Sequence, residues 1–206
     1  MDSTSERYRD ARAVFDAKRT LTPDQKAIAL YWADNAGESG TPVGHWFSIA
    51  SQMVSERRLS LADAARLMVA TAASQADAFI ASWGYKYKFN TLRPRPYIRS
   101  TMDSLWEPFI PTPPFPEYPS GHSTQSAAAA TVLTASLGES PFQDSTVVSI
   151  GHSVRKFASF NAAAEEAGIS RVYGGIHYPS ANVNGRALGQ CIGRKVAERL
   201  LAGHTH

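Results

Sequence analysis

The chain has 206 residues, enough for one domain with a sizeable core. A composition of 43% hydrophobic and 19% charged residues is typical of a soluble globular protein, and no run of about 18 apolar residues predicts a membrane span. The net charge of +3 suits an anionic ligand, but Lys and Arg are spread along the chain, which argues against a nucleic-acid partner. The single cysteine, Cys191, excludes an internal disulfide.

The polar residues 1–7 predict no secretory signal in this chain. The cellular location stays open, and a periplasmic or secreted protein is compatible with the sequence if the chain is a piece of a longer one.

The first half of the chain predicts four helices. The first covers residues 6–18, and the second opens with a capping box formed by Thr22 and Gln25. The third covers about residues 41–57. The fourth begins at Ser60, and its apolar stripe is expected at Leu61, Ala64, Ala65, Met68, Ala72, Ala76, Phe79 and Ile80.

The segment 94–119 holds eight of the twelve prolines and predicts a long irregular loop, because each proline removes a backbone donor and constrains the residue before it. Loops of that length inside compact domains are usually functional.

Helices are predicted again from residue 120 or 121 to 137, from 153 to 167 and from about 180 to 201, with a short extended piece at 146–150. We therefore expect a single all-α domain over 1–206, a helical bundle with a long Pro-rich loop at its active site.

Three segments carry chemistry suited to an oxyanion. Lys86 and Arg93 are seven residues apart, so both would lie on one face if the helix reached that far, although such a pair alone usually marks a solvated face. Residues 120–122 precede a helix, whose free first-turn amides and dipole attract anions; the alternative is an ordinary serine cap. Arg171 can fork onto an oxyanion, and His177 follows six residues later; the alternative is a core histidine beside a surface arginine.

Taken together, the three segments resemble the signature of a superfamily that joins vanadium-dependent haloperoxidases to type-2 phosphatidic acid phosphatases and bacterial acid phosphatases. The matching residues are Lys86 with Arg93-Pro94, Pro119-Ser120-Gly121-His122, and Ser170-Arg171 with His177, in the family's order and spacing. Phe115-Pro116-Glu117-Tyr118 and Tyr173-Gly174-Gly175-Ile176 resemble the bacterial haloperoxidase branch.

The resemblance implies a vanadate cofactor, in a site that phosphate can also occupy. Lys86, Arg93 and Arg171 would neutralise the vanadate oxygens. The Ser120 hydroxyl and the Gly121 amide would assist them.

The resemblance also implies the catalytic roles. His177 would bind vanadium through an imidazole nitrogen, His122 would act as the acid–base group, and Lys86 would polarise the peroxide. Hydrogen peroxide would oxidise a halide to hypohalous acid, and an organic acceptor would be halogenated by it. Homo-oligomer formation is an expectation from the family alone.

Two aromatic residues are candidates for the pocket. Trp83 would line it or donate its indole hydrogen, although simple packing is the simpler interpretation, and Phe115 would shape the halide pocket. His45 and His152 have no motif around them and are interpreted as structural.

One position departs from the family pattern. The residue four after the histidine of the third motif is often Asp, and here it is Ala181. Since such a carboxylate would orient the histidine, we expect Asn182, Asn184 or a backbone carbonyl to take its place.

Two rival functions stay open. A phosphomonoesterase would use the same residues to bind phosphate, with His177 as nucleophile and His122 as the acid, although Ala181 counts against it. A non-catalytic oxyanion-binding domain would bind vanadate without turnover. A membrane lipid phosphatase would need spanning helices that the sequence does not predict.

Overall fold

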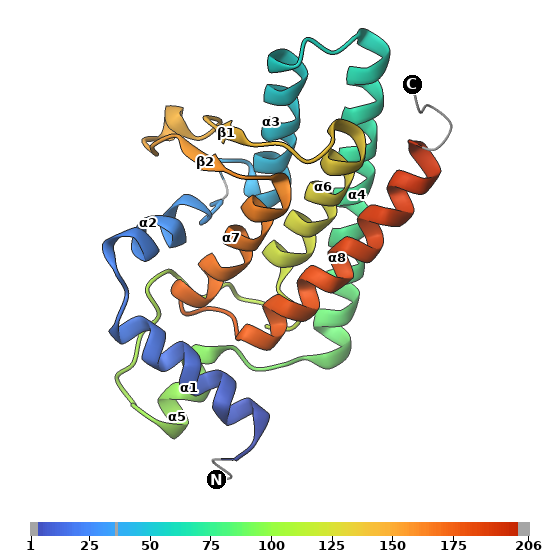
Figure 1. Ribbon diagram of the computed structural model, residues 1–206. Helices are drawn as coiled ribbons and strands as arrows, with labels where there is room; N and C mark the ends of the chain where they lie inside the picture. The colour runs from blue at the N-terminus through green and yellow to red at the C-terminus, as the bar shows by residue number, and fades with distance from the viewer. Residues whose placement is uncertain (1–3, 36, 202–206) are drawn as a thin grey trace.

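Figure 1 shows the computed structural model, which describes residues 4–35 and 37–201. The expected domain covers 1–206, and its residues 1–3, 36 and 202–206 lie outside the described residues. The helices are α1 (Glu6–Arg19), α2 (Pro23–Tyr31), α3 (Thr41–Glu56), α4 (Leu61–Phe89), α5 (Pro94–Thr101), α6 (Gly121–Leu137), α7 (Phe160–Tyr173) and α8 (Pro179–Leu200). A short hairpin of β1 (Phe142–Asp144) and β2 (Arg155–Phe157) flanks the 3-10 turn η1 (Val148–Ile150). The predicted all-α class is confirmed.

Helix α6 is the centre of the bundle, with α3, α4, α7 and α8 around it (Figure 1). Its alanine-rich surface is almost entirely buried. Helix α8 approaches it through glycines four residues apart, and a Cβ added to Gly189 would lie only 2.1 Å from the Thr124 carbonyl oxygen. At the start of α6, the Ser120 amide donates to the Ala181 carbonyl oxygen at 3.1 Å. The N-terminus of α6 is thereby held at a fixed place against α8.

The largest apolar core lies between α2, α3, α6, α7 and the hairpin. Trp32 and Trp46 are completely buried there, with ring centroids 6.0 Å apart. Phe142 and Phe157 pair across the hairpin and pack towards Phe160. This core holds α2 against α7 and α3 against α6, and the loop between α2 and α3 reaches the candidate site.

Helix α4 forms as predicted, with Ser60 as its cap, but the expected stripe was wrong. Leu61 and Ile80 are 88% and 68% exposed, and Phe79 is also exposed. The buried face contains Leu67, Ala70, Thr71, Ser74, Gln75, Ala78, Ser82 and Lys86. Polar residues are tolerated there because they find partners; the Gln75 side chain, for example, donates to the Gln125 carbonyl at 2.8 Å.

The Pro-rich segment contains a helix that the sequence analysis excluded. Helix α5 starts at Pro94, and Pro96 also lies in its first turn, where the backbone N–H groups have no intrahelical partner to lose. The remainder, residues 102–119, is irregular as predicted apart from turns. Helix α4 ends at Phe89, followed by Asn90 with φ 45°, so Lys86 and Arg93 do not share one helix.

The region between α6 and α7 also differs from the prediction. The strand is Phe142–Asp144, not 146–150, and Arg155–Phe157 pairs with it instead of starting a helix. Helix α7 continues past Gly168 to Tyr173. A Cβ at Gly168 would lie 3.1 Å from the Ser123 hydroxyl, so this glycine serves close packing against α6 and does not end the helix.

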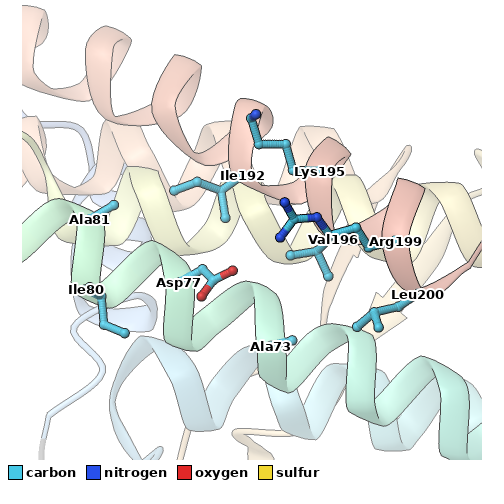
Figure 2. A pocket seen from close by; sticks show the side chains of 9 residues that line it. All are labelled: Ala73, Asp77, Ile80, Ala81, Ile192, Lys195, Val196, Arg199 and Leu200. Carbon is cyan, nitrogen blue, oxygen red and sulfur yellow. The ribbon is translucent and has the colours of Figure 1, made fainter.

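A groove of about 430 Å³ lies between α4 and α8 (Figure 2), and none of the motif residues lines it. It is lined by Ala73, Asp77, Ile80, Ala81, Ile192, Lys195, Val196, Arg199 and Leu200. Among the described residues, no helix is both long and apolar enough to cross a membrane.

Candidate active site

The three motif segments meet at one place in the bundle. Lys86 comes from the last turn of α4, Arg93 caps α5, and Arg171 lies in the last turn of α7. His177 precedes α8, and residues 120–122 form the start of α6. Lys86 is 0% exposed, Arg93 5% and Arg171 1%, so three cationic side chains are buried in one region.

A cavity of about 540 Å³ opens onto these motifs. His122, Arg171 and His177 are on its wall, together with Gly121 and Asp34. Its apolar wall contains Phe79, Trp83, Phe115 and several prolines of the irregular loop. Lys86, Arg93 and Ser120 do not line it and lie behind this wall.

His177 is held between a carboxylate and a guanidinium. Its Nδ1 is 2.7 Å from Glu117 Oε1, and its Nε2 is 3.1 Å from Arg93 Nη1. Glu117 accepts from Nδ1–H and Arg93 donates to Nε2, so the partners assign a neutral imidazole with its lone pair on Nε2. Burial, together with the charges of Arg93 and Lys86, holds the pKa of His177 well below its usual value. A neutral Nε2 is the form that can coordinate a metal or attack phosphorus.

Glu117 fills the role that the sequence analysis assigned to other residues. Its Oε1 also accepts from the Tyr178 amide at 3.0 Å, and burial raises the pKa of Glu117 to about 7. Asn182 instead donates to the Gly168 carbonyl at 2.6 Å, and Asn184 is exposed. The only sequence signal for this role was that Glu117 lies three residues before Ser120 in the second motif. Nothing in the sequence indicates that Glu117 contacts His177, which is 60 residues further along the chain.

Lys86 donates to three backbone carbonyls of the segment before α6. The distances from Nζ to the oxygens of Pro116, Glu117 and Pro119 are 3.1, 2.9 and 2.6 Å. Burial and the charge of Arg93 lower the pKa of Lys86 to about 7. Since an ammonium has three hydrogens, Lys86 would have to exchange one of these bonds to reach an oxyanion.

Arg93 and Arg171 have spare donor capacity. Arg93 donates through Nε to Phe115 at 2.9 Å and through Nη1 to the Ile176 carbonyl at 2.8 Å, while its buried Nη2 has no partner. Arg171 donates to the Ser170 hydroxyl and the Ala29 carbonyl. Burial lowers the pKa of each guanidinium to about 10, so both stay charged at neutral pH. An unpaired donor on a buried cation favours an anionic ligand.

The start of α6 is a close-fitting backbone site. Ser120 caps the helix, since its hydroxyl oxygen accepts from the Ser123 amide at 3.3 Å. A Cβ on Gly121 would lie 3.2 Å from the Trp83 ring and 3.9 Å from Lys86 Cε. Glycine therefore leaves room at the point where the free helix amides meet the cavity.

His122 is paired with an aspartate that the sequence analysis did not consider. His122 Nε2 is 3.5 Å from Asp34 Oδ2, which is too long for a hydrogen bond of normal length, and neither buried atom has a hydrogen-bond partner among the described residues. Burial and the charge of Arg171 lower the pKa of His122 to about 4, against the opposing effect of Asp34. Burial alone would raise the pKa of Asp34, but its interactions with His122 and His45 outweigh burial and hold that pKa below its usual value.

Trp83 and Phe115 form an aromatic wall above Lys86. Their ring centroids are 5.1 Å apart, and Lys86 Nζ is 5.6 Å and 5.4 Å from the two rings. Phe79 stacks on Trp83 at 4.0 Å. Both residues therefore lie at the cavity, while their effect on a halide stays a prediction.

Comparisons with known proteins show which family the chain resembles. The family described as "VCPO second helical-bundle domain" matches residues 66–204. The vanadium chloroperoxidase of Curvularia inaequalis is 32% identical over an alignment that covers 55% of this chain and 22% of that protein.

Solved structures extend the likeness to almost the whole chain. A bacterial vanadium-dependent iodoperoxidase is 38% identical with a TM-score of 0.92, over 97% of this chain and 51% of that one. A holo-type bacterial vanadium-dependent chloroperoxidase, 21% identical with a TM-score of 0.77 over 98% and 50% of the two chains, shares the fold. So does a transmembrane PAP2-type phosphatidylglycerolphosphate phosphatase from Bacillus subtilis, 18% identical with a TM-score of 0.60 over 96% and 88%.

The chain spans about half the length of the solved haloperoxidases it matches and less than a quarter of the curated chloroperoxidase. The match to the family description nevertheless covers most of the chain and includes all three motif segments. The chain therefore belongs to the family of the VCPO second helical-bundle domain, among the vanadium-dependent haloperoxidases and their relatives.

Proposed function

We propose that this chain is the vanadate-binding domain of a haloperoxidase that oxidises halide with hydrogen peroxide to hypohalous acid. The observation that carries the proposal is His177, whose Nε2 lone pair is oriented by Glu117 within a group of buried cations. Hydrogen peroxide, a halide and an organic acceptor are the proposed reactants.

The residues of the site fit vanadate on two grounds. Lys86, Arg93 and Arg171 are three buried basic groups, and the two guanidinium groups are charged at neutral pH. The partnerless Nη2 of Arg93 also supplies a donor for an anion. A tetrahedral oxyanion would complete both the charge and the hydrogen bonding of the site.

Vanadate would be held by His177 Nε2, by the guanidinium groups of Arg93 and Arg171, and by the Gly121 amide, with Ser120 and Lys86 as further donors after rearrangement. When bound, it would supply a pentavalent Lewis acid that activates peroxide towards halide. His122 is neutral at neutral pH and, with its Nε2–H directed at Asp34, keeps a lone pair on Nδ1 that can take up the proton that peroxide loses. Trp83 and Phe115 would exclude water from this region.

A histidine-nucleophile phosphomonoesterase is the second candidate, and one observation favours it. The Glu117–His177 pair gives the histidine the carboxylate that Ala181 could not supply, so the sequence argument against a phosphatase loses its force. The overall likeness to vanadium haloperoxidases and the apolar wall of the cavity favour the first candidate.

The test is a pair of assays on the purified chain. One sample receives orthovanadate and peroxide with iodide, bromide or chloride and an organic acceptor, and halogenation is followed. A vanadate-free sample receives p-nitrophenyl phosphate, and His177→Ala serves as the control in both assays.

Vanadate-dependent halogenation that disappears in His177→Ala is the expected result. The halide that is hardest to oxidise among those the enzyme accepts would then classify it as an iodo-, bromo- or chloroperoxidase. Phosphate release without halogenation would replace the proposal with the phosphatase. Vanadate binding with neither activity would indicate a binding domain, or a domain that needs the part present in its longer relatives.

A further inference from the structure

A chain of buried ionisable side chains extends from the candidate site into the core. His45, on α3, is 1% exposed; its Nδ1 is 2.8 Å from Asp34 Oδ1, and its Nε2 is 2.8 Å from Asp144 Oδ2. At the far end, the Tyr31 hydroxyl donates to Asp144 Oδ2 at 2.7 Å. The four residues come from α2, the loop after it, α3 and β1.

The hydrogen-bond partners determine the protonation of His45. Both ring nitrogens face carboxylate oxygens, which can only accept while ionised, so both nitrogens carry hydrogen and the ring is an imidazolium. Burial opposes this charge, but the bonds to Asp144 and Asp34 outweigh it and raise the pKa of His45 to about 9. The Trp32 ring stacks on the imidazolium at 4.7 Å and limits its rotation.

Asp144 is a firmly bound anchor for this imidazolium. Its Oδ1 accepts from the Thr146 amide at 3.0 Å and from the Thr146 hydroxyl at 2.7 Å. Asp144 is 0% exposed, and every bond described here keeps its carboxylate in one orientation. His45 is therefore fixed from the side opposite to the cavity.

The two oxygens of Asp34 contact different residues. Oδ1 accepts from His45 and from the Ser39 hydroxyl, at 2.8 Å in each case. Oδ2 has no hydrogen-bond partner among the described residues and faces His122 Nε2 at 3.5 Å. The charged groups facing His122 are Asp34 and Arg171, and the Trp32 backbone also lies within reach of its ring. Because Oδ1 is bound from behind, Oδ2 stays directed at His122.

We propose that His45 is a positioning residue: its imidazolium, anchored by Asp144 and Tyr31, holds the Asp34 carboxylate so that Oδ2 faces the Nε2–H of His122. The negative charge of Oδ2 at this nitrogen favours the His122 tautomer with hydrogen on Nε2 and the lone pair on Nδ1. The role of that lone pair in catalysis rests on the proposed function, whereas the tautomer itself does not. His45 is thus more than the structural histidine that its sequence surroundings suggested.

The test is the tautomer of His122 in the ¹⁵N-labelled chain without vanadate, measured by imidazole ¹H–¹⁵N correlation spectra. The His122 signals are assigned by their loss in His122→Gln. The wild type is expected to show His122 with hydrogen on Nε2 only. His45→Gln is expected to give a mixture of the two neutral tautomers.

Turnover gives the second readout. In His45→Gln, kcat for halide oxidation is expected to fall roughly tenfold or more, as for a weakened acid–base group. The vanadate Kd and the halide KM are expected to stay within about threefold, because their binding groups are untouched. If the wild type oxidises no halide, the proposed function fails, and the tautomer still decides the role of His45.

Met53→Ala is the matched control, since Met53 is a completely buried residue of the same helix that contacts the main core and makes no polar bond to the network. It should lower the melting temperature yet keep the Nε2–H tautomer. If His45→Gln does not fold, Asp144→Asn removes the anchor and should shift the tautomer in the same direction. The proposal would be overturned if folded His45→Gln or Asp144→Asn protein still showed His122 with hydrogen on Nε2 only. It would also be overturned if Met53→Ala gave the same mixture of His122 tautomers as that expected for His45→Gln.

Discussion

At the scale of single residues, the two histidines of the motifs differ in what lies behind them. His177 has the carboxylate of Glu117 on its Nδ1, at 2.7 Å, and His122 has Asp34 on its Nε2, at 3.5 Å. In each case the partner leaves the opposite nitrogen with the lone pair. The two imidazoles can therefore take different tasks, one as a ligand and one as a proton carrier, while both remain neutral.

Replacing Glu117 with Gln should weaken vanadate binding about 10- to 100-fold, the range usual for the loss of a partner behind a metal-binding histidine. The Gln oxygen can still accept from Nδ1–H, but it lacks the charge that increases the basicity of Nε2. Calorimetric titration with orthovanadate measures the change. Glu107→Gln, an exposed carboxylate paired with Arg95 and Arg99, is the control and should bind like the wild type.

The same titration tests the role of Glu117 against simple packing. If Glu117→Gln binds vanadate within a factor of about two of the wild type, the charge of Glu117 has no part in orienting or activating His177.

The His45 imidazolium should make its contribution to stability dependent on pH. The pKa of His45 is raised to about 9 in the folded chain from 6.5 unfolded, so its contribution is complete below about 6.5 and is lost as pH rises through 9. The difference in unfolding free energy between wild type and His45→Gln should therefore shrink over that window. Urea unfolding at a series of pH values measures it, and a difference that stays constant or grows would contradict a charged His45.

At the scale of secondary structure elements, the contact between α6 and α8 determines where the site's backbone donors lie. Gly185, Gly189 and Gly193 allow α8 to lie close against α6 along its length. The same contact positions Ser120, whose amide binds the Ala181 carbonyl at the start of α8. Ala181 is thus a buried packing residue here, and the carboxylate beside His177 is that of Glu117.

Gly189→Ala should destabilise the chain by about 1–3 kcal/mol, the usual cost of overpacking, because the new Cβ would lie 2.1 Å from the Thr124 carbonyl oxygen. Gly84→Ala is the matched control. Gly84 is an exposed position inside α4 with nothing within 4 Å of an added Cβ, so this change should stabilise by about 0.5–1 kcal/mol. Denaturant unfolding of both variants measures the two effects, and equal effects would show that the α6–α8 contact adapts freely.

At the scale of the whole molecule, the bundle buries Lys86, Arg93 and Arg171 in one region, and the buried Nη2 of Arg93 has no hydrogen-bond partner among the described residues. Such an arrangement is unfavourable in the absence of an anion, so an anion that binds the folded chain should stabilise it. At a ligand concentration of 100 times Kd, the gain is about 2.7 kcal/mol.

Orthovanadate should therefore raise the melting temperature in a concentration-dependent way, and phosphate should do so less strongly because it cannot take His177 as a ligand. In His177→Ala the two anions should become similar, since only the shared charge and hydrogen-bond contacts remain. Thermal unfolding monitored by circular dichroism measures these shifts. Equal stabilisation of the wild type by both anions would argue against coordination by His177.

Features of the fold that depend on residues close together in the sequence could be predicted, and features that depend on distant residues could not. The capping box at Thr22 and the serine cap of α4 act within a few residues, and both were confirmed. The buried face of α4 and the pairing of Phe142 with Phe157 depend on distant neighbours, and there the sequence predictions were wrong. Helix α5 was missed because prolines, which usually break helices, are harmless in a first turn.

The sequence by itself determined the helical class and which side chains supply oxyanion chemistry, because residue types and the spacing of motifs are local properties. Only the tertiary structure decided that Glu117 orients His177, that Asp34 faces His122 with His45 behind it, and that Lys86 binds three carbonyls. The partners of His177, His122 and Lys86 are 30 to 88 positions away in the sequence. His45 and Asp34 are closer, but they belong to a helix and a separate loop, so no local pattern encodes any of these pairs. A buried polar group takes whichever partner the packing brings to it, and that choice is made when the helices assemble.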